Sequence, residues 1–341
     1  MTEFFRKNKL ALAGFIIVIA LTLAALFAPW LAPYDPAGQT LADRLEGPSW
    51  KHPFGNDELG RDILSRILLG TRVSMRVGAT VVLLSVIVGV LIGGFAGYIG
   101  GKLDIFVTVV VINSLMAFPG ILLAIALVAF LGPGIDRLIF ALTIISWVGY
   151  ARLARGQVLK VKTHEFVEAA RALGASSLRI FVSHILPNII QPILIQASIG
   201  MAVAILSEAS LSFLGLGITP PTPSWGSMLN DGRNHLFDAP HMVIFPSIAL
   251  VMTVLSFNLW VTHFGIGWTR GIWGNSGAGP KGSDPSSPQF GTRGLTPLTP
   301  VPELPGGTFD HAFQACPRIV VPDISFDSFG ILANLRAERG A

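Results

Sequence analysis

The sequence contains very little cysteine and none of the common local signatures of catalytic or nucleotide sites. Cys316 is the only cysteine among 341 residues, so no intrachain disulfide and no cysteine-based metal cluster can form. The HExxH pair, the EF-hand loop, the GxSxG elbow and the glycine-lysine pattern of a P-loop are all missing. We therefore expect no catalytic residues, no metal and no cofactor on this chain. If ATP drives the protein, another chain must bind the nucleotide.

Charged residues are also scarce. They make up 13% of the chain against 51% hydrophobic residues, with a mean hydropathy of +0.63, whereas a soluble domain carries about 25% charged residues. The net charge of +4 fits basic cytoplasmic loops and gives no reason to expect a nucleic-acid partner. The composition predicts an all-α membrane protein in contact with lipid.

The hydrophobic residues are clustered into long apolar runs. The first, residues 10–31, exceeds the roughly 7–15 apolar residues of a signal peptide and is about as long as a membrane-spanning helix. We therefore predict a retained first span rather than a cleaved signal. Six transmembrane helices are expected in all, at about 10–31, 77–99, 104–131, 137–155, 188–213 and 241–262.

Basic residues in the short loops indicate the orientation of the spans. The basic N-terminal segment, residues 1–9, is predicted to be cytoplasmic in a multi-pass protein of the cell (inner) membrane. With six spans, the lysine- and arginine-rich segment Arg152–His184 lies on the same side. Residues 34–76 disagree with this rule, because they are placed outside and yet carry six lysines and arginines.

Residues 32–76 are predicted to form a periplasmic loop followed by an amphipathic segment. The stretch HPFGNDELGRDILSRILLGTRVSMRVG mixes acids and bases, and apolar residues recur in it at helical spacing, namely Ile63, Leu64, Ile67 and Leu68. Three interpretations stay open: a helix lying against the membrane, an ordinary surface helix, or a helix that leads into the next span.

Small and polar residues inside the spans indicate packing and function. Gly89, Gly93 and Gly97 recur every four residues, a spacing that lets two helix backbones approach closely. Glu208, near the outer end of the fifth span, is expected to hydrogen-bond within the outer loop region, and Asn113 lies inside the third span. No set of His, Asp and Glu converges on the spans, which disfavours a membrane-embedded enzyme.

Residues 156–187 interrupt the apolar runs with a charged helical hairpin between the fourth and fifth spans. Gly174 stands where a helix end favours a left-handed residue, a serine after it caps the second helix, and Pro187 ends that helix. An apolar stripe for docking runs along the first helix, 161–173: Phe166, Ala169, Ala170 and Leu173. Such a hairpin, joined to two spans, is suited to transmit a push from a soluble partner.

The stretch EAARALGASSLRIFVSHILP in this hairpin resembles the EAA loop of ABC-importer permeases. Four further stretches, in family order, resemble the C-type permease of dipeptide, oligopeptide and nickel importers: HPFGNDELGRDILSRILLGTRVS, AFPGILLAIALVAFLGPG, YARLARGQVL and SEASLSFLGLGITPPTPSWGSML. The resemblance covers residues 1–259. The family's EAA pattern is matched by position at Glu168, Ala169, Ala170, Gly174, Leu186 and Pro187. Relatives often carry an arginine and an aspartate around Val110 and Asn113, and both charges are absent here.

This resemblance implies a function and a set of partners. The EAA loop would form a coupling helix seated in an ATPase subunit, and ATP-driven closure of two cytoplasmic ATPases would switch the pathway from inward- to outward-facing. A second, homologous permease and a periplasmic or lipid-anchored solute-binding protein would complete an importer of dipeptides or oligopeptides. A nickel or other metal-chelate importer is the alternative within the family, and an ion-coupled secondary carrier is the alternative outside it.

The last part of the chain departs from the resemblance. After Leu259 the family continues with a stretch like LGDALRDxLDPR, whereas this chain reads WVTHFGIGWTRG. Reverse translation in the neighbouring frame spells the family stretch, so we hypothesise that residues from Trp260 onward are translated out of frame. Residues 263–341 are then expected to be a disordered tail, in agreement with the Gly/Pro/Ser-rich stretch 274–308. A genuine disordered tail or a small accessory domain is the alternative.

Overall fold

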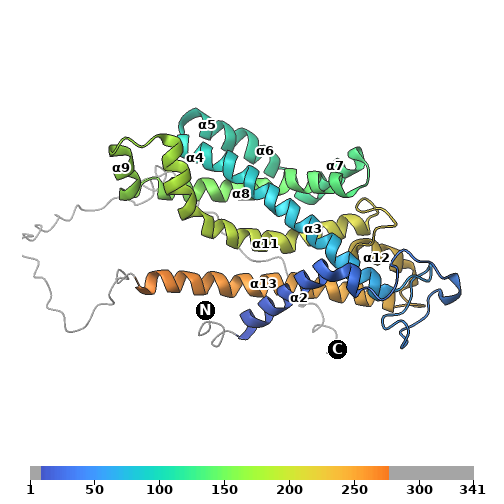
Figure 1. Ribbon diagram of the computed structural model, residues 1–341. Coiled ribbons are helices and arrows are strands. Elements are labelled where there is room, and N and C mark those ends of the chain that lie inside the picture. The colour runs from blue at the N-terminus through green and yellow to red at the C-terminus, as the bar shows by residue number, and fades with distance from the viewer. Residues whose placement is uncertain (1–8, 276–341) are drawn as a thin grey trace, which may run out of the picture. The chain divides into compact units, whose positions relative to one another are not determined.

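The computed structural model describes residues 9–275, and all regular structure in that range is helical apart from one isolated bridge between Asn56 and Asp62. The predicted all-α class is thereby confirmed. Five long helices form the framework (Figure 1): α2 (Lys9–Leu31), α3 (Ile63–Gly89), α8 (Ile135–Val161), α11 (Leu186–Phe213) and α13 (His241–Asn275).

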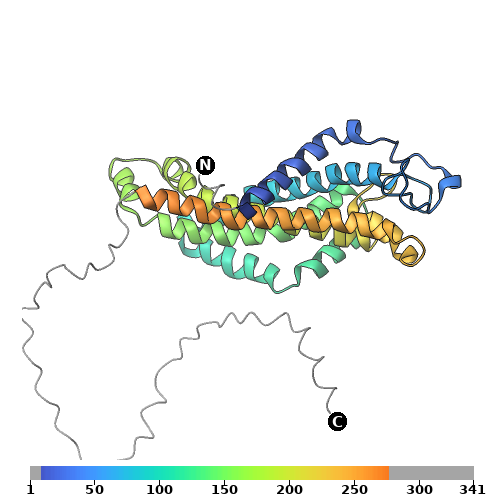
Figure 2. The same ribbon diagram turned by 90° about the horizontal axis from the view of Figure 1, so that it is seen from below.

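Five helical segments of the described range are long and apolar enough to cross a membrane: Leu12–Leu31, Ile63–Ile99, Ile135–Val161, Ser177–Phe213 and His241–Trp260. A sixth crossing is made only if Gly101–Met116 and Gly120–Leu131 count as one span, and these two segments are bent by 82°. The third span predicted over 104–131 is therefore present only as a pair of helical segments with a sharp bend between them. Pro119 explains the break (Figure 2), because a proline disfavours helical geometry in the residue before it and lacks a backbone N–H.

The second span begins well before residue 77. Asp62 caps α3, since its carboxylate accepts the backbone N–H of Ser65 at 2.8 Å. The helix then continues through a π-helical turn, η2 (Val90–Gly94), into α4 (Phe95–Ile99). Of the three interpretations of the amphipathic segment, the structure supports the one in which it leads into the next span.

The fifth span also begins earlier than predicted. Ser176 caps α10 (Ser177–Ile180), which runs through another π-helical turn, η4 (Phe181–Ile185), directly into α11. Pro187 therefore does not end the second helix of the hairpin. A proline removes one helical hydrogen bond and crowds the carbonyl four residues earlier, and a wide turn just before it relieves that crowding.

Helix α8 lies at the centre of the described helices, packed against α3, α4, α7 (Gly120–Leu131) and α11. The largest cluster of buried apolar side chains joins α3, α7, α8 and α11 and includes Val77, Val81, Leu138, Leu142 and Leu211. Helix α2 packs against α3 and α13 instead. A movement of α8 or α11 would therefore displace most of the other spans, because these helices pack against them closely.

The tail predicted from residue 263 begins inside a helix, because α13 extends to Asn275. The expectation of irregular structure is wrong for these first residues. The rest of the predicted tail, residues 276–341 with Cys316, lies outside the described residues, as do residues 1–8.

Candidate functional site

The charged hairpin turns at Gly174, directly after α9 (Glu165–Ala172). Gly174 has a φ of +81°, a conformation that side chains with a Cβ disfavour. Its N–H donates to the carbonyl of Arg171 at 3.0 Å, and the N–H of Ala175 donates to the carbonyl of Ala170 at 3.1 Å. These paired bonds form a Schellman helix end, and Gly174 has the left-handed conformation predicted for it.

One face of α9 is anchored to the spans. Val167 and Ala170 are buried in a cluster that also contains apolar residues of α8, α10, η4 and α11. Phe181 of η4 stacks on Phe95 of α4 with ring centroids 4.4 Å apart. Because packed interiors have little free space, a displacement of α9 is passed on to α4, α8 and α11.

Two polar contacts tie the end of α8 to its neighbours. Arg155 donates to both carboxylate oxygens of Asp104, on α5 (Gly101–Ile105), at 2.5 and 2.8 Å. Lys162, the residue after α8, donates to the backbone carbonyl of Gly97 on α4 at 2.9 Å. A bidentate arginine–carboxylate pair adds orientation to its attraction, so the base of the hairpin is held to α4 and α5.

The other face of the hairpin exposes apolar side chains. Leu173 is 88% exposed and Phe166 is also exposed. Both border a hollow of about 420 Å³, lined by Phe166, Ala169, Ala170, Leu173, Gly174, Ala175, Arg179 and His184. The stripe predicted along the first helix is divided, because Ala170 is buried while the other three residues face outward.

The residues matched to the EAA pattern fall into two groups. Ala169, Ala170 and Gly174 line the hollow, and Glu168 is exposed beside them on α9. The half-buried Leu186 and the exposed Pro187 lie at the start of α11, directly after η4. Only the first group therefore contributes to the surface around the hollow; Leu186 and Pro187 do not line it.

Gly89, Gly93 and Gly97 all lie against α8. A Cβ built on Gly93 would collide with the backbone of Ala151, and one on Gly89 would lie 2.6 Å from the Cβ of Tyr150. A Cβ on Gly97 would meet Arg155 at 3.1 Å from its Cγ. The three glycines of the second span thus allow its backbone to lie close to α8, the helix that leads into the hairpin.

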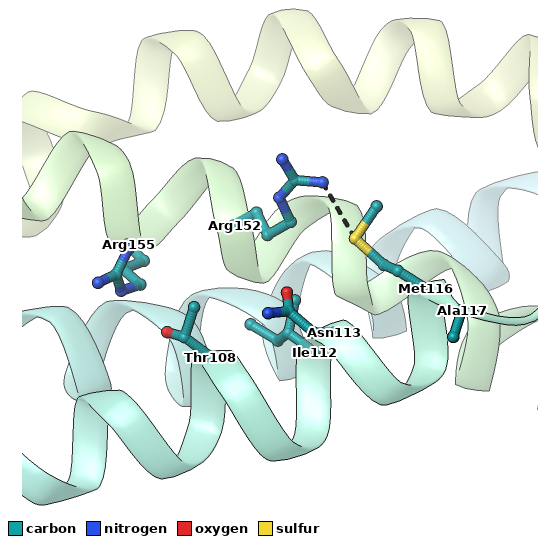
Figure 3. A pocket seen from close by; sticks show the side chains of 7 residues that line it. All are labelled: Thr108, Ile112, Asn113, Met116, Ala117, Arg152 and Arg155. Atoms are coloured by element: carbon teal, nitrogen blue, oxygen red, sulfur yellow. Dashed lines mark hydrogen bonds between the residues drawn. The ribbon is translucent and has the colours of Figure 1, made fainter. Parts of the chain in front are cut away.

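A second cavity, of about 630 Å³, opens between α8 and the helix formed by η3 (Phe106–Ile112) and α6 (Asn113–Met116). Figure 3 shows its lining residues: Thr108, Ile112, Asn113, Met116, Ala117, Arg152 and Arg155. Asn113 and Arg152 enter it from opposite helices. Sequence reasoning had not singled out Arg152 as a site residue, although a base inside the apolar run 137–155 is a signal that could have found it.

Glu208 on α11 is completely buried. Its carboxylate accepts hydrogen bonds from the hydroxyls of Ser74 on α3 and Ser212 on α11, each at 2.8 Å. The expected hydrogen bonding to the outer loop region is present through Ser224, the residue that caps α12 (Trp225–Gly232), and Ser74 and Ser212 add partners from the long helices. Glu208 therefore links α3 to α11.

A buried ionic cluster that the sequence did not predict joins the segment before α3 to the start of α3 and to α12. Asp57 accepts from Nε of Arg61 at 2.6 Å and lies 3.5 Å from Nε of Arg66. Both arginines also reach Asp231, at 3.3 and 3.4 Å, and burial raises the pKa of that carboxyl although Arg66 and Arg61 lower it. Within residues 9–275, no group of three or more His, Cys, Asp or Glu is placed to bind a metal ion.

Comparison with known families agrees with this arrangement. Residues 89–265 match the model of binding-protein-dependent transport system inner membrane components, and residues 3–48 match the N-terminal transmembrane domain of oligopeptide transport permease C. The chain belongs to this family. It is a multi-pass inner-membrane permease subunit of an ABC importer, of the C type that the sequence resemblance predicted.

Curated relatives resemble the chain over most of its length. It is 46% identical to the glutathione transport system permease protein GsiD of Escherichia coli and of Shigella sonnei, over 256 residues, which is 75% of this chain and 84% of each relative. It is 43% identical over 254 residues to the dipeptide transport system permease protein DppC of Alkalihalophilus pseudofirmus, covering 74% of this chain and 83% of the relative. Both relatives are named as transport permeases.

Proposed function

We propose that the chain forms half of the membrane pathway of an ATP-driven peptide importer and that its hairpin couples this pathway to an ATPase. The two-faced hairpin carries the proposal: one face exposes Phe166 and Leu173 around a hollow, and the other is packed onto the spans. An exposed apolar hollow favours a protein partner. The hairpin and the N-terminal segment lie in the cytoplasm, and the ionic cluster lies on the outer side.

The coupling step is mechanical. When two ATPases close around ATP, the docked subunit pushes α9, and the hydrogen-bonded turn at Gly174 keeps α9 and α10 at a fixed angle. Val167 and Ala170 pass the push to α8 and α11 through close packing. A second, homologous permease moves in the same way, so the pathway changes from inward- to outward-facing, ready to accept solute from the binding protein.

Peptides are the solutes that the relatives favour. The two relatives are named for glutathione and for dipeptides, and both are peptide-type solutes. No contact among the described residues specifically favours a metal chelate over a peptide. The membership of a binding-protein-dependent family also favours partner-driven import over an ion-coupled carrier.

Replacing Leu173 with aspartate tests the coupling surface. A charge at the edge of the docked hollow should weaken the ATPase complex by about 30-fold or more, the size of an interface hot spot. The readouts are copurification of the ATPase subunits from native membranes and ATP-dependent uptake in proteoliposomes that also contain the binding protein. Leu41→Asp is the matched control, because Leu41 is 69% exposed but lies in the segment before α3. Unchanged ATPase copurification with Leu173→Asp would refute the coupling role.

A further inference from the structure

Two arginines of α8 enter the cavity of Figure 3, and only one of them is neutralised. Arg155 is paired with Asp104 through two hydrogen bonds. Arg152 forms no ion pair with any residue between 9 and 275, and its guanidinium donates instead to the Met116 sulfur at 3.0 Å. A thioether is a weak acceptor and carries no charge, so the cavity retains one uncompensated positive charge.

Arg152 lies inside Ile135–Val161, a helix long and apolar enough to cross a membrane, although the sequence placed it at the start of the cytoplasmic segment. At about 1.5 Å per residue, its Cα lies roughly 14 Å from the C-terminal end of the helix at Val161. Charged side chains at membrane depth face a protein partner or a water-filled path, because exposure to lipid is too unfavourable. The Arg152 side chain is exposed on this chain, so it faces one of these two environments.

The surroundings of Arg152 suit a small polar solute. The cavity volume of about 630 Å³ falls within the range of roughly 300–1,000 Å³ that is typical of small-molecule sites. Asn113 offers an amide that has no hydrogen-bond partner among residues 9–275, and Ala117 lies at the 82° break between α6 and α7. Transporters commonly bind solutes where a spanning helix is interrupted.

We propose that Arg152 binds a carboxylate of the transported solute in this cavity, with the Asn113 amide as a second hydrogen-bonding group. A guanidinium matches a carboxylate with two parallel hydrogen bonds, which gives orientation as well as affinity. The inference rests on the proposed function and narrows its substrate class to solutes with a free carboxylate, such as the C-terminus of a peptide. An acidic side chain of the partner permease is the competing occupant.

Thiol labelling tests whether the charge is accessible from water. Asn113→Cys in a Cys316→Ser background, in membranes containing the whole importer, is treated with a sulfonate-bearing or a trimethylammonium-bearing methanethiosulfonate. After normalisation to free cysteine, the anionic reagent should react about tenfold faster, the scale of one accessible charge at hydrogen-bond distance in water. Arg152→Gln should abolish this preference, while Arg137→Gln, near the other end of α8, should leave it intact. Absence of labelling, or a preference that survives Arg152→Gln, would overturn the proposal.

Uptake then identifies the ligand. Proteoliposomes with the whole importer receive a pooled set of dipeptides and their C-terminal amides, and accumulated solutes are quantified by mass spectrometry. Arg152→Gln should lower uptake of the acids about tenfold relative to wild type, the effect of losing a charged hydrogen bond, and should lower uptake of the amides by less than half. Arg152→Lys should recover part of the difference. All variants receive solute from the same binding protein. Its preference for acids or amides therefore cancels when uptake by a variant is divided by uptake by the wild type.

Two other outcomes separate the hypotheses. An equal loss for acids and amides, or loss of the partner permease on purification of Arg152→Gln, would show that Arg152 serves assembly, and the carboxylate site would be refuted. If the wild-type importer accumulates no peptide at all, the proposed peptide function fails, whereas the labelling result still decides whether the cavity attracts anions.

Discussion

The loop segment before α3 and the hairpin between α8 and α11 contrast in the residues that they bury and expose. Before and at the start of α3, Asp57, Arg61 and Arg66 are only 4%, 6% and 3% exposed, and all three are paired. On the hairpin, Leu173 is 88% exposed around an apolar hollow. The charges of the ionic cluster find opposite charges within the chain, whereas an exposed apolar hollow is stabilised when a partner covers it. The contrast indicates which surface binds another subunit.

The largest expected effect is the loss of Asp57. Asp57→Ala leaves Asp231 as the one carboxylate for the two buried arginines, Arg61 and Arg66, so a buried positive charge loses its partner, which should cost about 3–5 kcal/mol of folding stability. A fall in the Tm of the purified protein in detergent, followed by tryptophan fluorescence, measures it.

Asp43→Ala is the control for that experiment. Asp43 pairs with Lys51 at 3.8 Å, and the Lys51 side chain is 68% exposed. An exposed pair of this kind contributes about 0–1 kcal/mol, so Tm should hardly change. Equal shifts for the two variants would mean that the cluster is not the stabilising element that its burial indicates.

A smaller loss is expected at the contact between η2 and α8. Gly93→Ala places a methyl group against the backbone of Ala151, which cannot yield as a side chain does, and should cost about 1–3 kcal/mol. Gly156→Ala on α8 is the matched control, because a Cβ there meets nothing within 4 Å and alanine favours the helix by about 1 kcal/mol. Opposite shifts in Tm are expected, and a stabilising Gly93→Ala would contradict the close approach of the two helices.

Gly174→Val should have the smallest effect on stability and a large effect on transport. A Cβ at Gly174 meets nothing within 4 Å, so the penalty is only that of a left-handed backbone, about 1–2 kcal/mol. The turn angle between α9 and α10 should relax, and ATP-dependent uptake should fall while membrane insertion is unchanged. Gly174→Asn should retain more uptake, because asparagine tolerates this conformation. Wild-type uptake by the valine variant would argue against a rigid hairpin.

Local signals account for the features that the sequence predicted. The apolar runs are long enough to identify the spans, and Gly174 with the serine after it marks the turn of the hairpin. The proline at position 119 is a local signal for the break, but the apolar run 104–131 is long enough to be read as one span. Asp62 before Ile63 is likewise a recognisable helix cap, and it places the start of the second span at residue 63 rather than near residue 77.

Long-range pairings could not be predicted from one sequence. Asp231 is far from Arg61 and Arg66 along the chain, and nothing in the local pattern indicates that these charges meet. The same holds for Ser74 and Glu208, and for the approach of Asn113 to Arg152. Their geometry depends on how the helices pack, which a periodicity does not encode.

The reading-frame hypothesis stays a prediction. The family match ends at residue 265, close to Trp260, where the sequence departs from the family pattern. Resequencing the gene should reveal one inserted or deleted base near codon 260, and restoring the frame should yield a C-terminal segment like LGDALRDxLDPR. A well-supported intact frame through that codon in related strains would contradict it.

Site-specific cross-linking from α9 tests the central claim most directly. A photoreactive amino acid at Ala169, which is exposed in the hollow, should capture an ATPase subunit in native membranes, whereas the same group at Leu41 should not. Capture should depend on the hollow and therefore decrease when Leu173 is replaced with aspartate. If Ala169 captures no ATPase while the importer is active, the hairpin is not the coupling element.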